Sequence, residues 1–204
     1  MIIGHWDEIF VTTPQKRLGW YEKDSEQTLK FVSKIKNLEN KKIFIAGAGT
    51  SMLNDALLNK CNNLIINDIS DEALSIVKKR IGDSSQKIEW LNADISLPLA
   101  IENASIDVWI DRAVLHFLTN EIDIQGYFQN LVTKIKLNGH AIIAVFSLEG
   151  SPICAGLNLH RYLIEEIDDR IGDSFKLIQY ESYTYINPDG DERPYIYSLF
   201  KKIK

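Results

Sequence analysis

The residues that could do chemistry in this chain begin with a pair of glycines and an acid. The stretch KIFIAGAGTSM, residues 42–52 of 204, is a short apolar run that ends in Gly47 and Gly49. Glycines at the end of a strand let the backbone approach a ligand closely. Asp68 ends the next apolar run, NLIIND, nineteen residues after Gly49, where an acid can accept hydrogen bonds from a ribose. This spacing favours a site for an adenosine-type ligand over the alternative, a glycine turn that only connects a strand to a helix.

Two other kinds of nucleotide site do not fit these residues. A dinucleotide fingerprint has a third glycine three residues after the second, and here that position is Met52. A P-loop needs a lysine followed by serine or threonine after its glycines, and none follows here. S-adenosylmethionine therefore fits better than a dinucleotide or a nucleoside triphosphate.

A second acid follows the third apolar run. In KIEWLNADI, Asp94 comes just after the expected strand, where it can hydrogen-bond the amino group of an adenine. The apolar side chains of Ile69 and Ile95 would flank the ring. The alternative for Asp94 is an ordinary turn residue.

Alternating strands and helices must bring these residues together. We expect strands over 41–46, 63–68, 87–92, 105–110 and 139–147, and helices over 25–38, 51–59, 70–82, 121–136 and 159–171, after an irregular opening. Two further strands, 175–185 and 193–201, are joined by INPDGDE, which leaves no room for a crossover helix. The order predicts a doubly wound, mostly parallel α/β sheet of seven strands, with helices on both faces and a C-terminal antiparallel β-hairpin.

Composition narrows the class of protein. A formal net charge of −5 argues against a nucleic-acid or membrane-surface partner, because both favour a basic face. No apolar run approaches the about 18 residues of a membrane span, and the opening MIIGHWDEIF lacks a signal-peptide core. The two cysteines have no metal-ligand spacing, so we expect no metal and a reducing, cytoplasmic setting. Without repeats or linkers, residues 1–204 are expected to form one domain.

The block after the fourth strand carries a family resemblance. The chain resembles the class I S-adenosylmethionine-dependent methyltransferases, and more narrowly a bacterial subgroup with an Asp-Arg-Ala-Val-x-His-Phe-Leu-Thr block, here DRAVLHFLT at 111–119. The subgroup's opening is matched by HWDEIF and LGWYEKDSEQTL, and its later loop by FSLEGSPICAGLNLHRY. The C-terminal hairpin is also what the methyltransferase version of this sheet carries. The resemblance covers nearly the whole chain.

This resemblance implies a cofactor site. Gly47 and Gly49 would contact the methionine part of S-adenosylmethionine through their backbones, and Asp68 would bind the ribose. Asp94, Ile69 and Ile95 would form the adenine pocket. Members of the family usually have an acid two residues before the first glycine, where this chain has Ile45; Asp111 or a backbone carbonyl would take its place.

The same block supplies the expected catalytic residues. Asp111 and Arg112 would lie beside the methyl donor, and a similar Asp-Arg pair in the thiopurine methyltransferases suggests a small, soft acceptor. A base is needed only if the acceptor arrives protonated. His116 is the candidate for that base, and the alternative is a histidine packed against the sheet.

Residues 1–40 are expected to form a cap over the site. Trp20 and Tyr21 precede the first expected helix and could close over the donor, where their rings favour the sulfonium charge; the alternative is that they are core aromatics. Arg161 could hold an acceptor carboxylate or pair with Glu165 four residues later.

We therefore predict an S-adenosylmethionine-dependent methyltransferase that leaves S-adenosylhomocysteine as product. The acceptor is expected to be a small molecule, methylated by in-line displacement. The alternatives are a protein lysine methyltransferase and a non-catalytic module that binds an adenosyl ligand. We expect a monomer or homodimer.

Overall fold

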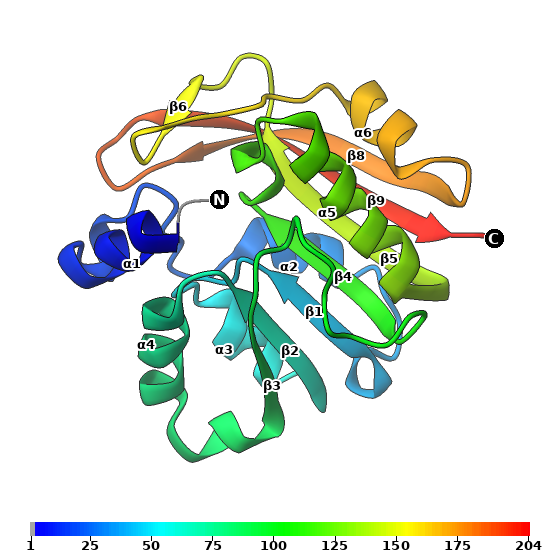
Figure 1. Cartoon of the computed structure of the whole chain (residues 1–204), viewed down its shortest axis with the longest axis horizontal. Helices are drawn as coiled ribbons and strands as arrows, with labels where there is room; N and C mark the ends of the chain where they lie inside the picture. The colour runs from blue at the N-terminus through cyan, green and yellow to red at the C-terminus, as the bar shows by residue number, and fades with distance from the viewer. Residues whose placement is uncertain (1–2) are drawn as a thin grey trace.

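Seven strands form one sheet at the centre of the structure, a computed structural model that describes residues 3–204 (Figure 1). They are β1 (Lys42–Ala46), β2 (Asn63–Asp68), β3 (Ile88–Asn92), β4 (Ile106–Arg112), β5 (Ile135–Phe146), β8 (Phe175–Ile186) and β9 (Glu192–Lys202). The order across the sheet is β3-β2-β1-β4-β5-β9-β8. The first five strands are parallel, whereas β9 runs antiparallel to both β5 and β8. The predicted sheet and its terminal hairpin are confirmed.

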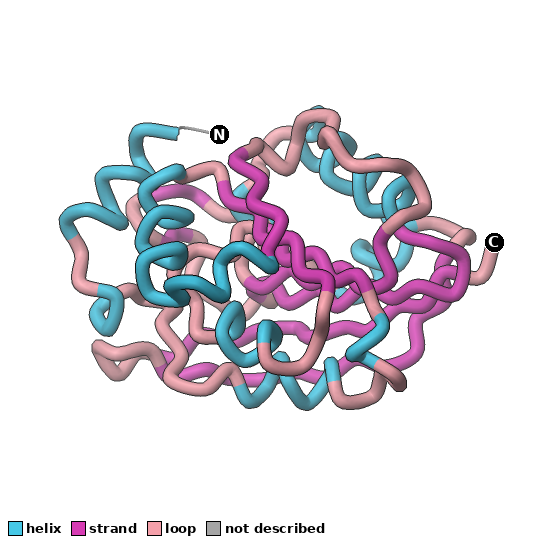
Figure 2. The backbone as a smooth tube through the Cα atoms, turned by 90° about the horizontal axis from the view of Figure 1, so that it is seen from below, coloured by secondary structure: helices cyan, strands magenta, loops and turns pink. Residues whose placement is uncertain are grey.

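Helices cover both faces of the sheet, as the view from below also shows (Figure 2). One face is covered by α2 (Glu26–Val32), α3 (Leu53–Leu58) and α4 (Asp71–Ile81), and the other by α5 (Glu121–Lys134) and α6 (Ile164–Ile171). Outside these layers, α1 (Ile3–Thr12) packs on α4. Short 3-10 turns lie at Gln15–Arg17, Leu38–Asn40, Gly82–Lys87 and Leu115–Phe117, and β6 (Ile153–Cys154) pairs with β7 (Leu157–Asn158).

The period-two alternation of the strands divides the core between the two faces. In β1, Ile43 and Ile45 face the α2–α4 side, and Phe44 faces the α5 side. There Phe44 stacks on Trp109 of β4, with ring centroids 4.2 Å apart. Such burial fixes the register of β1 between β2 and β4, and with it the relative height of the loops that follow these strands.

Two helices begin at side-chain caps, in the segments that follow β2 and β4. The Ser70 hydroxyl accepts a hydrogen bond from the Ala73 amide (3.2 Å), and the Asn120 side chain accepts one from the Asp123 amide (2.9 Å). Each cap satisfies an amide that the helix itself leaves free. Ser70, the first residue of the helix predicted over 70–82, is thus the N-cap of α4.

The opening of the chain is not irregular, and this prediction was wrong. Residues 3–12 form α1, whose apolar side chains Trp6 and Phe10 are buried one helical turn apart. They pack with Leu18 and Ala73 in a small cluster separate from the two faces of the sheet. Residues 1 and 2 of the predicted 1–40 cap lie outside the described part of the chain.

Three other boundaries differ from the prediction. The helix expected over 25–38 ends at Val32, and the one expected over 159–171 begins only at Ile164. Residues before Ile164 are extended because the Tyr162 amide bonds to the Phe146 carbonyl (3.0 Å) and continues the sheet pairing. The strand expected to begin at 139 begins at Ile135, which pairs with Ile106. Among residues 3–204, no helix is long and apolar enough to cross a membrane.

One glycine in α5 fixes how this helix sits on the loop after β3. A Cβ added to Gly126 would lie 1.9 Å from the carbonyl oxygen of Ser96, the residue after Ile95. Alanine normally stabilises a helix interior by about 1 kcal/mol relative to glycine. We expect Gly126→Ala instead to lower the free energy of unfolding by about 1–3 kcal/mol, measured by urea denaturation.

The control is Gly4→Ala in α1, where an added Cβ has nothing within 4 Å. This variant should be as stable as the parent or slightly more so. Equal stability of the two variants would contradict the close packing of Gly126.

Candidate active site

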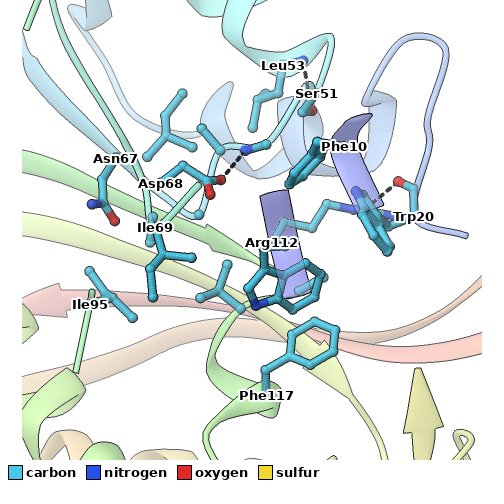
Figure 3. Close-up of a pocket in the computed structure, with 18 of the residues that line it drawn as sticks. Phe10, Trp20, Ser51, Leu53, Asn67, Asp68, Ile69, Ile95, Arg112 and Phe117 are labelled. Atoms are coloured by element: carbon cyan, nitrogen blue, oxygen red, sulfur yellow. Dashed lines mark hydrogen bonds between the residues drawn. The ribbon is translucent and has the colours of Figure 1, made fainter. Parts of the chain in front are cut away.

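A cavity of about 90 Å³ lies where β1, β2 and β4 end at their carboxyl edge (Figure 3). Residues from the ends of four strands and from the N-terminal segment line it. They are Ile45–Gly49, Ser51 and Leu53 from the end of β1 onward, Asn67–Ile69 at the end of β2, Ala93 and Ile95 after β3, Arg112–Val114 and Phe117 from the end of β4 onward, and Trp6, Phe10 and Trp20. This edge is where open α/β sheets bind ligands. The cavity therefore lies where the sequence placed the site.

The glycine loop needs glycine at both positions. Gly47 and Gly49 have φ angles of +48° and +49°, a region that side chains disfavour. A Cβ on Gly47 would also lie 2.2 Å from Cγ2 of Val114. The Val114 side chain thus packs directly on the loop backbone at Gly47.

Asp68 joins β2 to this loop. One of its carboxylate oxygens accepts a hydrogen bond from the Gly49 amide (2.6 Å), and the other accepts one from the Ser70 amide (2.9 Å). Burial raises the pKa of Asp68 to about 6, although the amide hydrogen bonds oppose this shift. The carboxylate is fixed in the cavity wall and its remaining lone pairs are available to a hydroxyl donor.

The expected adenine pocket is only partly assembled. Ile69 and Ile95 line the cavity, but Asp94 does not. One oxygen of Asp94 instead accepts hydrogen bonds from the amide and the hydroxyl of Ser96 (2.9 and 2.7 Å). Asn67, which the sequence reasoning missed, lies in the wall and donates to the carbonyls of Leu91 and Ala93 (3.1 and 2.9 Å).

Aromatic rings cover the open side of the cavity. Trp20 was predicted there, and it packs edge-on against Trp6 and Phe10, with centroids 5.8 and 6.1 Å apart. Trp6 also meets Phe117 edge-on at 4.8 Å, and its buried indole N–H has no hydrogen-bond partner among residues 3–204. The sequence reasoning missed Trp6, Phe10 and Phe117. The i, i+4 spacing of the first two in HWDEIF was the available signal.

Arg112 lies in the cavity wall but is held by the protein itself. Its guanidinium donates to the Trp20 carbonyl (3.0 Å) and forms an ion pair with Glu22 at 2.9 Å. It also lies 5.2 Å from the ring centroids of both Tyr185 and Tyr195. The predicted catalytic arginine therefore fastens the segment that carries Trp20 to the end of β4.

Asp111 does not reach the cavity, in contrast to the prediction. Adjacent residues of a strand point to opposite faces, so Asp111 lies on the α5 side while Arg112 points away from it. Its carboxylate accepts hydrogen bonds from the amides of Val114 (2.9 Å) and Leu115 (3.0 Å), and burial raises its pKa to about 6. Asp111 shapes the turn after β4 and is not placed to bind a cofactor.

His116 is a buried core residue, so the prediction of a general base is wrong for this structure. Its side chain is fully buried and its Nδ1 accepts a hydrogen bond from the Phe146 amide (3.1 Å). Burial, with Arg112 nearby, lowers its pKa to about 3. Because its Nδ1 is occupied and its ring is buried outside the cavity wall, His116 does not reach an acceptor in the cavity.

Two flanking residues also differ from their expected roles. Arg161 does not pair with Glu165. It donates to the carbonyls of Leu148 (2.8 Å) and Gly150 (3.0 Å) and so closes the loop after β5. Tyr21 lies outside the cavity wall, and its carbonyl accepts a hydrogen bond from the Tyr185 hydroxyl.

Comparison with known proteins agrees with this geometry. Residues 45–143 match the family model described as a methyltransferase domain, a segment that runs from β1 into β5. No curated protein sequence matches the chain. The family match agrees with the enzyme class expected above, a methyltransferase, and the fold is shared with structures solved as S-adenosylmethionine-dependent methyltransferases.

Solved structures share the whole fold at low sequence identity. An S-adenosylmethionine-dependent methyltransferase from Anabaena variabilis superposes with a TM-score of 0.77 at 14% identity, over 98% of this chain and 93% of that one. The N-methyltransferase NodS from Bradyrhizobium japonicum, solved with S-adenosylhomocysteine, gives 0.71 at 13%, over 99% and 98%. A structure from work on the conversion of a disulfide bond into a thioacetal group in echinomycin biosynthesis gives 0.76 at 15%, over 99% and 93%.

The chemical character of the cavity residues suits each part of S-adenosylmethionine. A fixed carboxylate at Asp68 suits a ribose, the apolar side chains of Ile69 and Ile95 suit a base, and aromatic faces such as that of Trp20 suit a sulfonium. The buried indole N–H of Trp6 remains available as a donor. Ile45 is part of the wall, so no acid at that position meets the ammonium group.

Asp68 should make cofactor binding depend on pH. An ionised carboxylate is the better acceptor for a ribose hydroxyl, so ligand binding favours the ionised form. Affinity for S-adenosylhomocysteine should therefore rise as the pH increases through about 6, the pKa of Asp68 in the free protein. Asp68→Asn should bind about tenfold more weakly and lose this dependence in calorimetry between pH 5 and 8.

Asp94→Asn is the matched control, because Asp94 lies outside the cavity wall. Its affinity should stay within about twofold of the parent. A large loss of affinity in Asp94→Asn would instead support the contact with adenine that the resemblance implies. An unchanged pH dependence in Asp68→Asn would contradict the assignment of Asp68 to the ribose.

Glu22 should be needed to keep Arg112 and Trp20 in place. The side chains of Glu22 and Arg112 are only 8% and 9% exposed, so Glu22→Ala leaves a buried guanidinium without its counter-charge. We expect a loss of about 3 kcal/mol in the free energy of unfolding, measured by urea denaturation. Glu181→Ala, which breaks a pair with the half-exposed Lys30, should cost less than about 1 kcal/mol. Similar losses in the two variants would show that Arg112 does not depend on Glu22.

Proposed function

We propose that this protein transfers the methyl group of S-adenosylmethionine to a small, soft nucleophile by in-line displacement. The observation that carries this proposal is the character of the cavity wall. Among the described residues that form it, only Asp68 and Arg112 have side chains that ionise, and protein partners hold both. Apart from Ser51 and Asn67, the remaining wall residues are apolar or aromatic, and none of them is a general base.

Bound S-adenosylmethionine would supply an activated methyl group on a sulfonium, which needs no further activation by the protein. The chain's own residues would orient the two reactants and exclude water, and alignment of this kind is worth about 7–11 kcal/mol. Trp20 and Phe10 would face the positive charge. Asp68 would hold the nucleoside end away from the reacting atoms.

The missing base limits the acceptor. A nucleophile in this cavity must offer its lone pair without losing a proton to a side chain, as a thiolate or a neutral amine does. An unactivated alcohol does not meet this condition. Among the structural neighbours, one is an N-methyltransferase and another comes from work on disulfide chemistry, so a nitrogen or a sulfur acceptor is compatible with the fold.

The N-terminal cap would move during the reaction cycle. Three rings of the N-terminal segment, those of Trp6, Phe10 and Trp20, line the cavity. The segment that carries Trp6, Phe10 and Trp20 would therefore open to admit the cofactor and close over it. Such closure excludes bulk water from the methyl transfer.

The aromatic cover favours a small acceptor over a protein lysine. A lysine side chain needs a channel through the cover, and there the Trp6 ring packs against those of Trp20 and Phe117 in T-shaped contacts. The second alternative is a module that binds an adenosyl ligand without catalysis. Ile45 supports it, because the acid that usually contacts the ammonium group is absent at this position.

The acceptor class can be tested with labelled S-adenosylmethionine. We expect methyl transfer to apolar thiols at least about 100-fold faster than to the matching alcohols, since only the thiols ionise near neutral pH. The rate should follow the acceptor's own ionisation, and His116→Asn should leave this pH profile unchanged. Transfer only to lysate proteins would favour the lysine alternative, and no transfer despite S-adenosylhomocysteine binding would favour the binding module.

We also propose the finer assignments that the resemblance suggests. The chain would be a member of the DRAVLHFLT subgroup, with residues 1–40 as the cap of a single catalytic domain. It would act in the cytoplasm as a monomer or homodimer, a setting that suits the two free cysteines, Cys61 and Cys154.

A further inference from the structure

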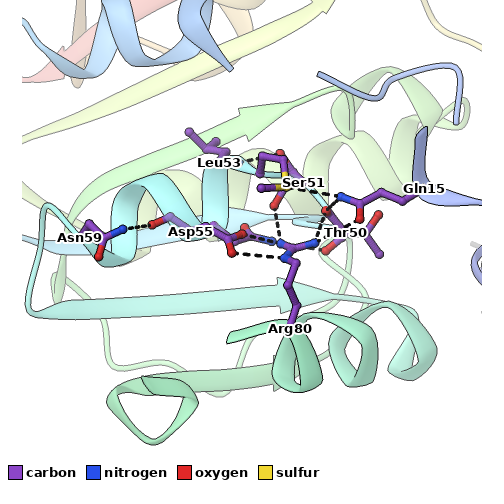
Figure 4. A network of polar contacts seen from close by, with 10 residues as sticks. Gln15, Thr50, Ser51, Leu53, Asp55, Asn59 and Arg80 are labelled. Carbon is purple, nitrogen blue, oxygen red and sulfur yellow. Dashed lines mark hydrogen bonds and ion pairs between the residues drawn. The ribbon is translucent and has the colours of Figure 1, made fainter. Parts of the chain in front are cut away.

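Arg80 binds the glycine loop through hydrogen bonds on the side away from the cavity. It lies near the end of α4, and its guanidinium donates to the carbonyl of Thr50 (2.7 Å) and to that of Ser51 (2.9 Å) (Figure 4). These carbonyls directly follow Gly49. Arg80 is not part of the cavity wall, so it holds the outer side of a loop whose inner side faces the ligand.

Asp55 of α3 orients this arginine. Its two carboxylate oxygens accept from Nε (3.2 Å) and from an Nη (2.6 Å) of Arg80 (Figure 4). A paired contact of this type fixes the plane of the guanidinium. The direction in which Arg80 presents its remaining donors to the loop is therefore set by α3.

The same carbonyl also holds the cap. The side-chain amide of Gln15 donates to the Thr50 carbonyl at 2.5 Å, next to the bond from Arg80. Gln15 lies between Phe10 and Trp20 in the chain, and both of these rings line the cavity. On the inner side, a Cβ on Gly49 would lie 3.2 Å from the Phe10 ring. The loop is thus held by Arg80 on one side and meets the cap through both Gln15 and Phe10.

We propose that Arg80 is a positioning residue for the cofactor site, acting through the glycine loop and, by way of Gln15, on the cap. The backbone at Gly47 and Gly49 has little intrinsic preference for the conformation it adopts, so an external clamp is needed to hold it ready for a ligand. Arg80 supplies that clamp without touching the cofactor. The proposal rests on S-adenosylmethionine as the cofactor and does not depend on which acceptor is used.

Calorimetry with S-adenosylhomocysteine tests the clamp. Arg80→Ala should weaken binding about tenfold, because the loop must then be ordered at the expense of binding free energy. Arg80→Lys keeps a charge and one donor to the loop, so its affinity should fall between those of Ala and the parent. It also provides a folded variant if Arg80→Ala is unstable. In turnover with an accepted thiol, KM for S-adenosylmethionine should rise while kcat changes less than about twofold.

Arg170→Ala is the matched control. Arg170 has the same 22% side-chain exposure as Arg80 and pairs with Glu121 and Glu166, none of which lines the cavity. It should show a comparable loss of thermal stability with affinity within about twofold of the parent. Parent-like affinity in Arg80→Ala, or an equal loss in Arg170→Ala, would overturn the proposal.

Gln15→Ala separates the two parts of the proposal. It should weaken S-adenosylhomocysteine binding about threefold. Its effect should be smaller in the Arg80→Ala background, because both side chains donate to the Thr50 carbonyl and Arg80 also donates to the Gln15 side chain (3.5 Å). Unchanged binding in Gln15→Ala would overturn the connection to the cap.

Discussion

The hydrogen bond from the Gly49 amide to the Asp68 carboxylate, 2.6 Å long and buried, is the contact on which the site depends. It joins the ends of two neighbouring parallel strands and fixes the glycine loop against β2. The bond forms only because Gly47 and Gly49 turn the backbone through positive φ angles. It also stabilises the ionised form of a buried carboxylate, whose pKa burial alone would raise further.

The cap over this site has no extensive core of its own and is held at separate points. Rings from α1 and Trp20 pack over the cavity, while Arg112 fastens the Trp20–Glu22 segment to β4. Gln15 fastens the cap to the glycine loop. These contacts involve residues that line the cavity or are bonded to residues that line it. A ligand that shifts the cavity wall therefore also shifts the segment that carries Trp6, Phe10 and Trp20. This arrangement suits an enzyme that must open for its cofactor and close for transfer.

The outcome at the DRAVLHFLT block shows where sequence reasoning reached its limit. Asp111 and Arg112 were assigned together, but strand alternation sends them to opposite faces and only Arg112 reaches the cavity. His116 is polar and close to the site in sequence, yet the Phe146 amide and the surrounding core hold it neutral. Likewise, one carboxylate oxygen of Asp94 accepts hydrogen bonds from the amide and the hydroxyl of Ser96. Residue type and position along the chain do not specify burial or partner.

The sequence alone determined the order and direction of the strands, the glycine loop, the acid at Asp68 and the C-terminal hairpin. These features follow from local rules: apolar periodicity, turn residues and the steric freedom of glycine. Only the tertiary structure decided that α1 covers the cavity, that Arg112 fastens the cap and that Arg80 clamps the loop. Each of those contacts joins segments at least 29 residues apart, and their energies depend on packing and burial that no local pattern contains.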